Sequence, residues 1–246
     1  MRMGLWPFKQ SKIVSDGMAE WHREKFAWLV EEFGEKTAFN SRTLVLPDAQ
    51  TFRSGGKSGH ELACQIFEQI KALAGVPHFE AELIATNETL PEYDGQNIAR
   101  PTPMAVAAGT FSVPNGNSVV ITYEAKLLKE PMRLVATLAH ELAHYVLATS
   151  SSKWPIDEED HEFLTDLTAI FLGFGIFQSN SAFEFSQFSD GNMQGWQTQR
   201  LGYLPQNDMV YATALFIKAK GIAADSAYKY LKPSLGKLLR KALASV

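Results

Sequence analysis

Two histidines and a glutamate lie close together in an apolar part of the chain, as His140, Glu141 and His144. Residues four apart lie on one face of a helix, with Cβ atoms roughly 5–6 Å apart, so both imidazoles can reach one metal ion. Glu141 points about 100° around the helix, since there are about 3.6 residues per turn, and can stand beside the ion without binding it. The pattern predicts a metal site where this carboxylate takes a proton from a metal-bound water.

The same spacing also arises by chance, and many helices carry histidines on their surface. The surrounding residues favour the metal site, because those from Leu134 to Leu147 are small or apolar apart from Thr137, Tyr145 and the motif itself. Two histidines and a glutamate on such a helix are costly to bury unless they have partners. A metal ion would supply that partner.

A second pair of carboxylates follows the first motif, again four residues apart, at Glu162 and Asp166. Asp166 is the only charged residue in 163–177, and a carboxylate in so apolar a stretch needs a hydrogen-bond donor. A metal-bound histidine has a second ring N–H that it can donate. The alternative is that Glu162 lies on the surface and that Asp166 accepts from a backbone amide.

His140-Glu141-x-x-His144 followed by Glu162-x-x-x-Asp166 resembles the gluzincin branch of the zincin metallopeptidases. The match covers about residues 131–175. The resemblance implies one zinc ion (Zn2+) bound by His140, His144 and Glu162, with Glu141 as the general base and Asp166 orienting a zinc-bound histidine.

Other residues remain alternatives for two of these roles. His161 and Glu158 are rival third ligands, because each can bind zinc and each lies close to Glu162 in the sequence. Hydrolysis also needs a group that stabilises an oxyanion. Tyr203 is the candidate for this role, with Tyr211 and Arg200 as alternatives, although ordinary packing would explain each of them equally well.

The composition and net charge of the chain exclude several classes of protein. The chain has 246 residues and is 46% hydrophobic, so it can bury a substantial core. Its net charge of −4 gives no sign of the basic surface that nucleic-acid-binding proteins carry. The N-terminus has no apolar run of a signal peptide, and the apolar stretch 167–177 is too short to span a bilayer. Cys64 is the only cysteine, which excludes an intrachain disulfide, argues against a thiolate zinc site and suits a cytoplasmic location.

Spacing and turn residues predict the elements that position the motifs. Helices are expected at 17–33, 60–74, 131–149, from about 157 to 177, at 209–217, and at 225–243 with a break near Pro233. Strands are expected at 43–46, 79–85, 104–113 and 118–123. Residues 179–196 read as an irregular segment, His22 as a surface residue and Cys64 as a small core residue.

These elements predict an α+β fold, in which a zincin-like domain of a small sheet and the active-site helices joins a mainly helical C-terminal part. The expected segments are an N-terminal helical and strand segment (1–57), the metal-binding core (58–178) and the helical C-terminal part (179–246), together forming one compact unit. By resemblance, the strand pair at 107–123 is the edge that binds an extended substrate.

The first functional hypothesis is a cytoplasmic zinc-dependent peptidase, a hydrolase acting on peptides or proteins with Glu141 as its general base. The alternative is a zincin-fold binding or regulatory protein whose zinc site is structural or weakly active. An open fourth coordination position favours the first hypothesis, and a closed one favours the second.

Overall fold

A computed structural model describes residues 12–86, 109–112, 119–156, 160–188 and 203–246, which form a mixed and mainly helical α+β fold. Its first half comprises α1 (Asp16–Phe33), η1 (Phe39–Ser41), α2 (Gly59–Leu73), β1 (Glu82–Thr86), β2 (Gly109–Ser112), β3 (Val120–Glu124) and η3 (Ala125–Lys129). Its second half comprises α3 (Pro131–Ala148), α4 (His161–Ala169), the wide turn η5 (Ile170–Phe174), α5 (Gly175–Phe188), α6 (Gln206–Lys220), α7 (Asp225–Tyr230) and α8 (Pro233–Leu243).

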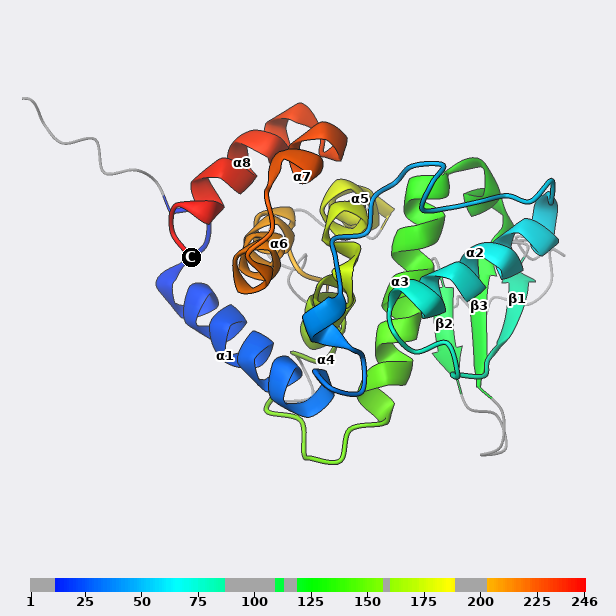
Figure 1. Ribbon diagram of the computed structural model, residues 1–246, viewed down its shortest axis with the longest axis horizontal. Coiled ribbons are helices and arrows are strands. Elements are labelled where there is room, and N and C mark those ends of the chain that lie inside the picture. Colours follow the sequence, from blue (N-terminus) through cyan, green and yellow to red (C-terminus); the bar gives the residue numbers. More distant parts are fainter. Residues whose placement is uncertain (1–11, 87–108, 113–118, 157–159, 189–202) are drawn as a thin grey trace, which may run out of the picture.

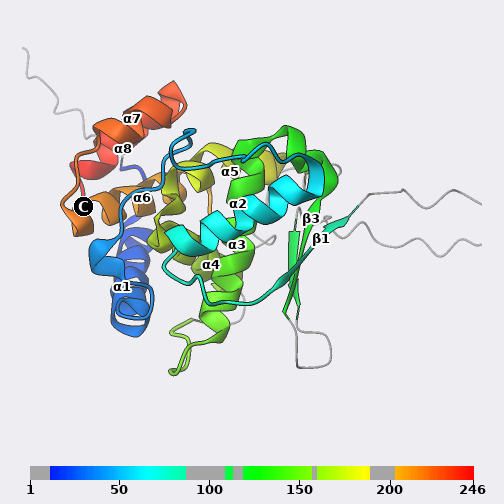
Figure 2. The same cartoon turned by 45° about the vertical axis from the view of Figure 1, so that its right-hand side comes forward.

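The central element is α3, which carries the first motif (Figure 1). It begins at Pro131, whose fixed φ suits the first turn of a helix. It packs against α2 and the sheet, and also against α4 and α5; Figures 1 and 2 place the sheet to one side of it and the group of α1, α4, α5 and α6 to the other. Because α3 is covered on most of its surface, its side chains are buried almost throughout, and its histidines are held on a rigid support.

The sheet has three strands in the order β1-β3-β2. β1 runs parallel to β3 with Leu83 opposite Ile121, and β2 runs antiparallel to β3 with Thr110 opposite Thr122. Leu83 and Ile121 are buried, whereas the hydroxyls of Thr110 and Thr122 lie 2.9 Å apart. The predicted strand pair is therefore present and antiparallel, but of its two strands only β2 lies at an edge of the described sheet, because β3 lies between β1 and β2.

The strand predicted at 43–46 is wrong. This segment is extended but pairs with none of the described strands, and the amide of Val45 donates to the carbonyl of Gly173 at 3.0 Å. Gly173 has φ 101° within the wide turn between α4 and α5, and a Cβ there would lie 2.9 Å from the Thr43 carbonyl oxygen. Glycine fits this close crossing because it has no Cβ and tolerates positive φ.

The irregular segment predicted at 179–196 is wrong for 179–188, which continues α5, while 189–196 lies outside the described residues. The polar side chains of this segment suggested an irregular surface segment, but in the structure they form hydrogen bonds inside the protein. Asn180 Nδ2 donates to the Tyr230 carbonyl at 2.9 Å, and the Ser179 hydroxyl lies 3.2 Å from that of Thr213. The boundary predicted between 178 and 179 thus falls inside a helix, and one core cluster includes residues from all three predicted segments.

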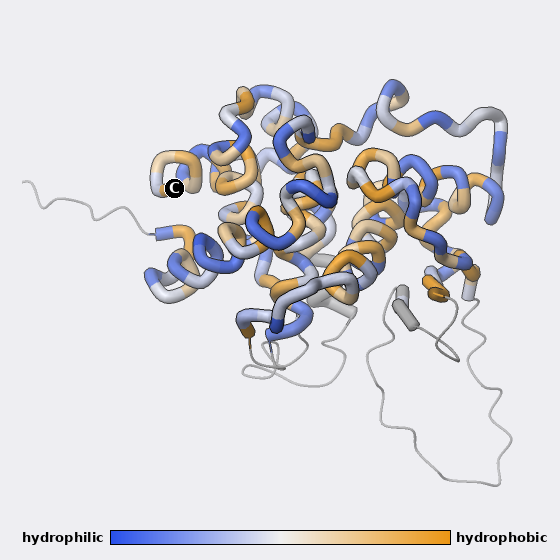
Figure 3. The backbone as a smooth tube through the Cα atoms, turned by 60° about the horizontal axis from the view of Figure 1, so that its bottom comes forward, coloured by the Kyte–Doolittle hydropathy of each residue, from blue (hydrophilic) through white to orange (hydrophobic). Residues whose placement is uncertain are grey.

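Most of the other predicted helices are present, but the one predicted from about 157 to 177 is interrupted by the wide turn Ile170–Phe174 between α4 and α5. Those predicted at 17–33, 60–74, 131–149 and 209–217 are present, and a break before Pro233 separates α7 from α8. Apolar residues, orange in Figure 3, alternate with hydrophilic residues along most helices, as expected when one face lies in the core. Cys64, predicted as a small core residue, packs against the core but is only half-buried, with its sulfur 3.4 Å from His60 Nε2.

His22 is not a surface residue, as its polar type suggested, but is fully buried on α1. It belongs to the stripe that continues with Phe26, Leu29 and Phe33, at the spacing of one helix face. Its Nε2 lies 3.0 Å from the Asp208 carboxylate on α6, which supplies the partner that a buried imidazole needs. The stripe was visible in the sequence, but its partner was not.

Within the described residues, none of the helices has the length and apolar character needed to cross a bilayer.

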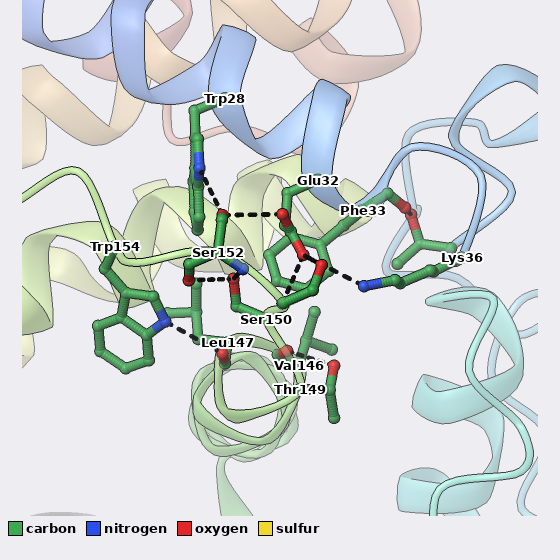
Figure 4. A network of polar contacts seen from close by, with 12 residues as sticks. Trp28, Glu32, Phe33, Lys36, Val146, Leu147, Thr149, Ser150, Ser152 and Trp154 are labelled. Atoms are coloured by element: carbon green, nitrogen blue, oxygen red, sulfur yellow. Dashed lines mark hydrogen bonds and ion pairs between the residues drawn. The ribbon is translucent and has the colours of Figure 1, made fainter.

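The connection after α3 is fastened to α1 through Glu32 (Figure 4). One oxygen of this carboxylate accepts from the amide and the hydroxyl of Ser151, both at 2.7 Å, and the other accepts from the hydroxyl of Ser152 at 2.8 Å. The backbone and side-chain hydrogen bonds from Ser151, followed by that from Ser152, lower the pKa of Glu32 from 4.5 to about 2. The anionic form of Glu32 therefore holds this connection in place.

We expect Glu32→Gln to destabilise the protein at neutral pH but not in acid. Because the folded-state pKa lies below the ordinary value of 4.5, the contribution of Glu32 is fully present above that pH and is lost as the pH falls toward about 2. Urea unfolding of both proteins from pH 7 to pH 2 measures the difference. A difference that is constant over this range would contradict the role of the ionised carboxylate.

Candidate metal centre

Three potential metal ligands converge where α3 packs on α4. Nε2 of His140 lies 3.1 Å from Glu162 Oε2, and Nε2 of His144 lies 3.5 Å from the same oxygen. Each of the three residues offers one ligand atom, and these atoms all lie within 4.8 Å of one another. The structure therefore brings together the three ligands expected from the sequence.

The spacing of these atoms can be compared with that required by a metal ion. Ligand atoms about 2.0–2.2 Å from a tetrahedral zinc ion lie roughly 3.3–3.6 Å from one another. The distances of 3.1 and 3.5 Å from the Glu162 oxygen to the two imidazole nitrogens are close to this value. Two imidazoles and a carboxylate also form a donor set that zinc accepts, although other divalent metals accept it too. The residues present therefore fit a zinc ion.

The ionisation state of Glu162 suits a metal ligand. Burial alone would raise its pKa, but hydrogen bonds with His140, His144 and His161 outweigh that effect and lower it well below its usual range. Glu162 is therefore an ionised carboxylate. A metal ion is bound by the ionised form, so no proton has to leave this ligand at neutral pH.

Asp166 orients His140 from the side opposite Glu162. Its Oδ1 lies 2.9 Å from His140 Nδ1, and its Oδ2 accepts from the backbone amide of Leu204 at 2.8 Å. An N–H on Nδ1 leaves the lone pair of Nε2 for a metal ion. Burial would lower the pKa of His140, but its hydrogen bonds to Asp166 and Glu162 raise it well above the usual value. Asp166 thus lies within hydrogen-bond distance of His140 Nδ1, where it can orient the ring.

Thr165 supplies the equivalent contact for His144, and the sequence analysis missed it. Its hydroxyl donates to the carbonyl of His161 at 3.0 Å, so the same oxygen can accept from His144 Nδ1 at 3.3 Å. This arrangement again leaves Nε2 for the metal. Thr165 lies three residues after Glu162 and so shares its helix face, which is the only signal that could have identified it.

Glu141 lies beside the three ligands without joining them. It is only 4% exposed and makes no hydrogen bond within the described part of the chain. Burial, aided by the charge of Glu162 and opposed by that of His140, raises its pKa to about 7. A carboxyl group with this pKa can both accept and donate a proton near neutral pH.

Of the two candidates for oxyanion stabilisation that the structure describes, Tyr203 lies at the centre and Tyr211 does not. The ring of Tyr203 lies 5.4 Å from that of His140, and burial, with the charge of Glu162, raises its pKa above the usual value, so the phenol stays protonated. Tyr211 instead accepts from Arg23 at 3.2 Å, outside the three-ligand set. Arg200 lies outside the described residues.

His161 is close to the centre but does not belong to the three-ligand set. Its Nδ1 lies 3.4 Å from the second oxygen of Glu162, and its ring stacks between those of His144 and Trp154. Glu158, the other rival ligand, lies outside the described residues. The geometry therefore favours Glu162 as the third ligand.

We expect Glu162→Ala to abolish stoichiometric zinc binding and His161→Ala to leave it nearly unchanged. Glu162 contributes the oxygen on which both Nε2 atoms converge, whereas His161 only stacks on a ligand. Zinc titration monitored with a competing chelator measures both affinities. The opposite order would move the third ligand to His161.

Thr165→Val should weaken zinc binding by about 10-fold, because it removes the group that orients His144, and loss of such a contact typically costs 10–100-fold. Thr168→Val is the matched control, since Thr168 is equally buried but only donates to the Leu164 carbonyl at 2.7 Å. Competitive titration of both variants gives the comparison. Equal affinities in the two variants would show that the Thr165 hydroxyl does not act on the metal centre.

Comparison with family models, with curated proteins and with solved structures found no match to this chain, so its functional assignment depends on the geometry of the centre.

Proposed function

We propose that the protein is a zinc-dependent peptidase of the gluzincin type with a zincin-like fold. The observation that carries this proposal is the position of Glu141, a buried carboxyl group with a pKa near 7 beside three convergent ligands. A purely structural site needs the ligands alone. A hydrolase also needs a proton acceptor that the metal does not occupy.

His140, His144 and Glu162 would hold the ion. When bound, zinc would lower the pKa of a water molecule and polarise the carbonyl of a peptide bond. Glu141 accepts the proton from the attacking water and returns it to the nitrogen of the leaving amine. In the metal-free protein, burial raises the pKa of Glu141 to about 7, and a group in this range can both take up and release a proton.

Two further groups would bind the substrate. The protonated phenol of Tyr203 donates a hydrogen bond to the oxygen that becomes negatively charged during attack. The edge strand β2 packs against α3 and offers backbone groups that can pair with an extended peptide. A peptide or protein substrate is proposed for this reason, and a cytoplasmic location because Cys64 is the only cysteine.

The donor set favours an enzyme over a binding protein with a closed structural site. Within the described residues, the group that could hold a metal contains three residues and no fourth histidine, cysteine or carboxylate. Structural zinc sites take four protein ligands, whereas catalytic sites take three and leave one position for water or substrate.

We expect Glu141→Gln to retain zinc and the fold but to lose activity. The change preserves the shape of the side chain and removes its ability to accept a proton, so kcat should fall by at least about 10²–10⁴-fold. A fluorogenic peptide library identifies a substrate for the wild-type protein, and kcat and KM are then compared at equal zinc content. Glu130→Gln, at the start of α3 and paired with Arg133 at 2.8 Å, is the control and should behave as wild type.

Two results would contradict this proposal. Full activity in Glu141→Gln would exclude the general base even with zinc bound. Absence of cleavage by the zinc-loaded wild-type protein across the library would favour the alternative of a binding or regulatory protein.

A further inference from the structure

The two oxygens of the Glu162 carboxylate face different partners. Oε2 lies 3.1 Å from Nε2 of His140 and 3.5 Å from Nε2 of His144. Oε1 instead lies 3.4 Å from Nδ1 of His161. A carboxylate can bind a metal ion through one oxygen or through both. The number of coordination positions that remain for water and substrate therefore depends on what holds Oε1.

Packing alone does not fix the carboxylate of Glu162. The side chain is 34% exposed, and the last torsion of a glutamate is broad, so the carboxylate can turn and exchange its two oxygens. Polar contacts therefore decide which oxygen faces the metal position. Among the described residues, the polar partner of Oε1 is His161.

His161 can donate a hydrogen bond to this oxygen. A carboxylate oxygen only accepts, so the contact favours the form of the imidazole that carries its N–H on Nδ1. Burial opposes the ionisation of Glu162, and the contact with His161 is one of three that outweigh burial and lower its pKa. An oxygen that accepts this N–H has less electron density to offer to a metal ion.

Stacked rings hold His161 in this position. Its ring lies 4.8 Å from that of Trp154, with the planes 13° apart, and 5.1 Å from that of His144, with the planes 24° apart. Trp154 is itself fixed, because its indole donates to the Leu147 carbonyl on α3 at 3.2 Å (Figure 4). His161 therefore lies between a metal ligand and a ring that is attached to the helix carrying that ligand.

We propose that His161 is a positioning residue that restricts Glu162 to a single metal–oxygen bond, through Oε2, and that Trp154 keeps His161 in place. The inference rests on the proposed function for its meaning in catalysis. A second bond through Oε1 would occupy a coordination position that water or the substrate carbonyl needs, and it would make the metal a weaker Lewis acid. The binding mode of Glu162 can be measured without a substrate, so the two proposals can be tested separately.

This role agrees with the expectation that His161→Ala leaves zinc affinity nearly unchanged. When the imidazole is removed, Oε1 is free to bind the metal, and the new metal–oxygen bond replaces the lost hydrogen bond. The strength of binding then changes little, while the number of ligand atoms rises from four to five, which zinc accepts.

The test is X-ray absorption at the zinc edge on zinc-loaded wild-type, His161→Phe and His161→Asn proteins. His161→Phe keeps a flat ring between His144 and Trp154 but has no N–H, so the metal should gain a fifth light-atom ligand and its mean distance to the ligands should lengthen. The amide nitrogen of His161→Asn takes about the place of Nδ1 and donates again, so this variant should retain four ligands. Cobalt(II) in place of zinc gives a second readout, because its visible absorption weakens when a fifth ligand binds.

Two tryptophan variants test the stack. Trp154→Leu removes the support of the His161 ring and should move the spectrum toward that of His161→Phe. Trp28→Leu is the matched control and should match the wild type. The indole of Trp28 also contacts the connection between α3 and α4, through the Ser152 hydroxyl at 3.3 Å, but its ring lies against Phe33. An unchanged spectrum in Trp154→Leu would overturn the role of Trp154.

The spectra of the His161 variants decide the proposal even if Trp154→Leu fails to fold. Five ligands in the wild type or in His161→Asn would overturn it, as would four ligands, or loss of zinc, in a folded His161→Phe protein. In a peptidase, kcat of His161→Phe should also fall by about 10–100-fold at equal zinc content. The expected spectra without cleavage by the wild-type protein would support the role of His161 and reject the peptidase, and cleavage with four ligands in every variant would do the reverse.

Discussion

His140 contacts a carboxylate through each of its two ring nitrogens, and the packing of α3 on α4 depends on this double contact. Nε2 lies 3.1 Å from Glu162, and Nδ1 lies 2.9 Å from Asp166. The imidazole and Asp166 are both buried, and neither would be stable there without the other. Because Glu162 and Asp166 are one helical turn apart on α4, they can lie on both sides of the ring only when the two helices cross at this point.

The same contact organises the chain around the centre. The second oxygen of Asp166 accepts from the amide of Leu204, so the carboxylate that orients His140 also holds the segment that carries Tyr203. A single buried side chain therefore sets the direction of a metal ligand and the position of the proposed oxyanion donor. Substitution of Asp166 would disturb both together, which distinguishes it from Thr165, whose contact is with His144 alone among the ligands.

The sequence predicted the parts of the site that depend on local spacing. His140 and His144 on one helix, and Glu162 and Asp166 on the next, are pairs four residues apart, and a helix places such pairs on one face whatever the tertiary structure. The helices that carry them were also predictable, because apolar spacing and a proline at the first position are local signals. The strands at 104–113 and 118–123 were predicted from the turn residues between them, and the structure pairs β2 with β3 antiparallel.

The parts that could not be predicted depend on contacts between distant segments. His22 is buried because Asp208, 186 residues away, accepts its hydrogen bond, and no local pattern indicates that partner. The polar residues of α5 looked irregular because their partners, Tyr230 and Thr213, lie on other helices. The extended segment at 43–46 looked like a strand because its local propensity is correct, but its backbone meets Gly173 instead of a sheet. The ring stack that joins Trp154 to His144 likewise exists only in three dimensions.

The most direct test of the account is X-ray absorption spectroscopy at the zinc edge on protein titrated to saturation. The account predicts one zinc ion per chain with four light-atom ligands, of which two are imidazoles and two are oxygens, one from Glu162 and one from water. Saturation without stoichiometric binding, a third imidazole, or a spectrum with four protein ligands and no exchangeable water would contradict it.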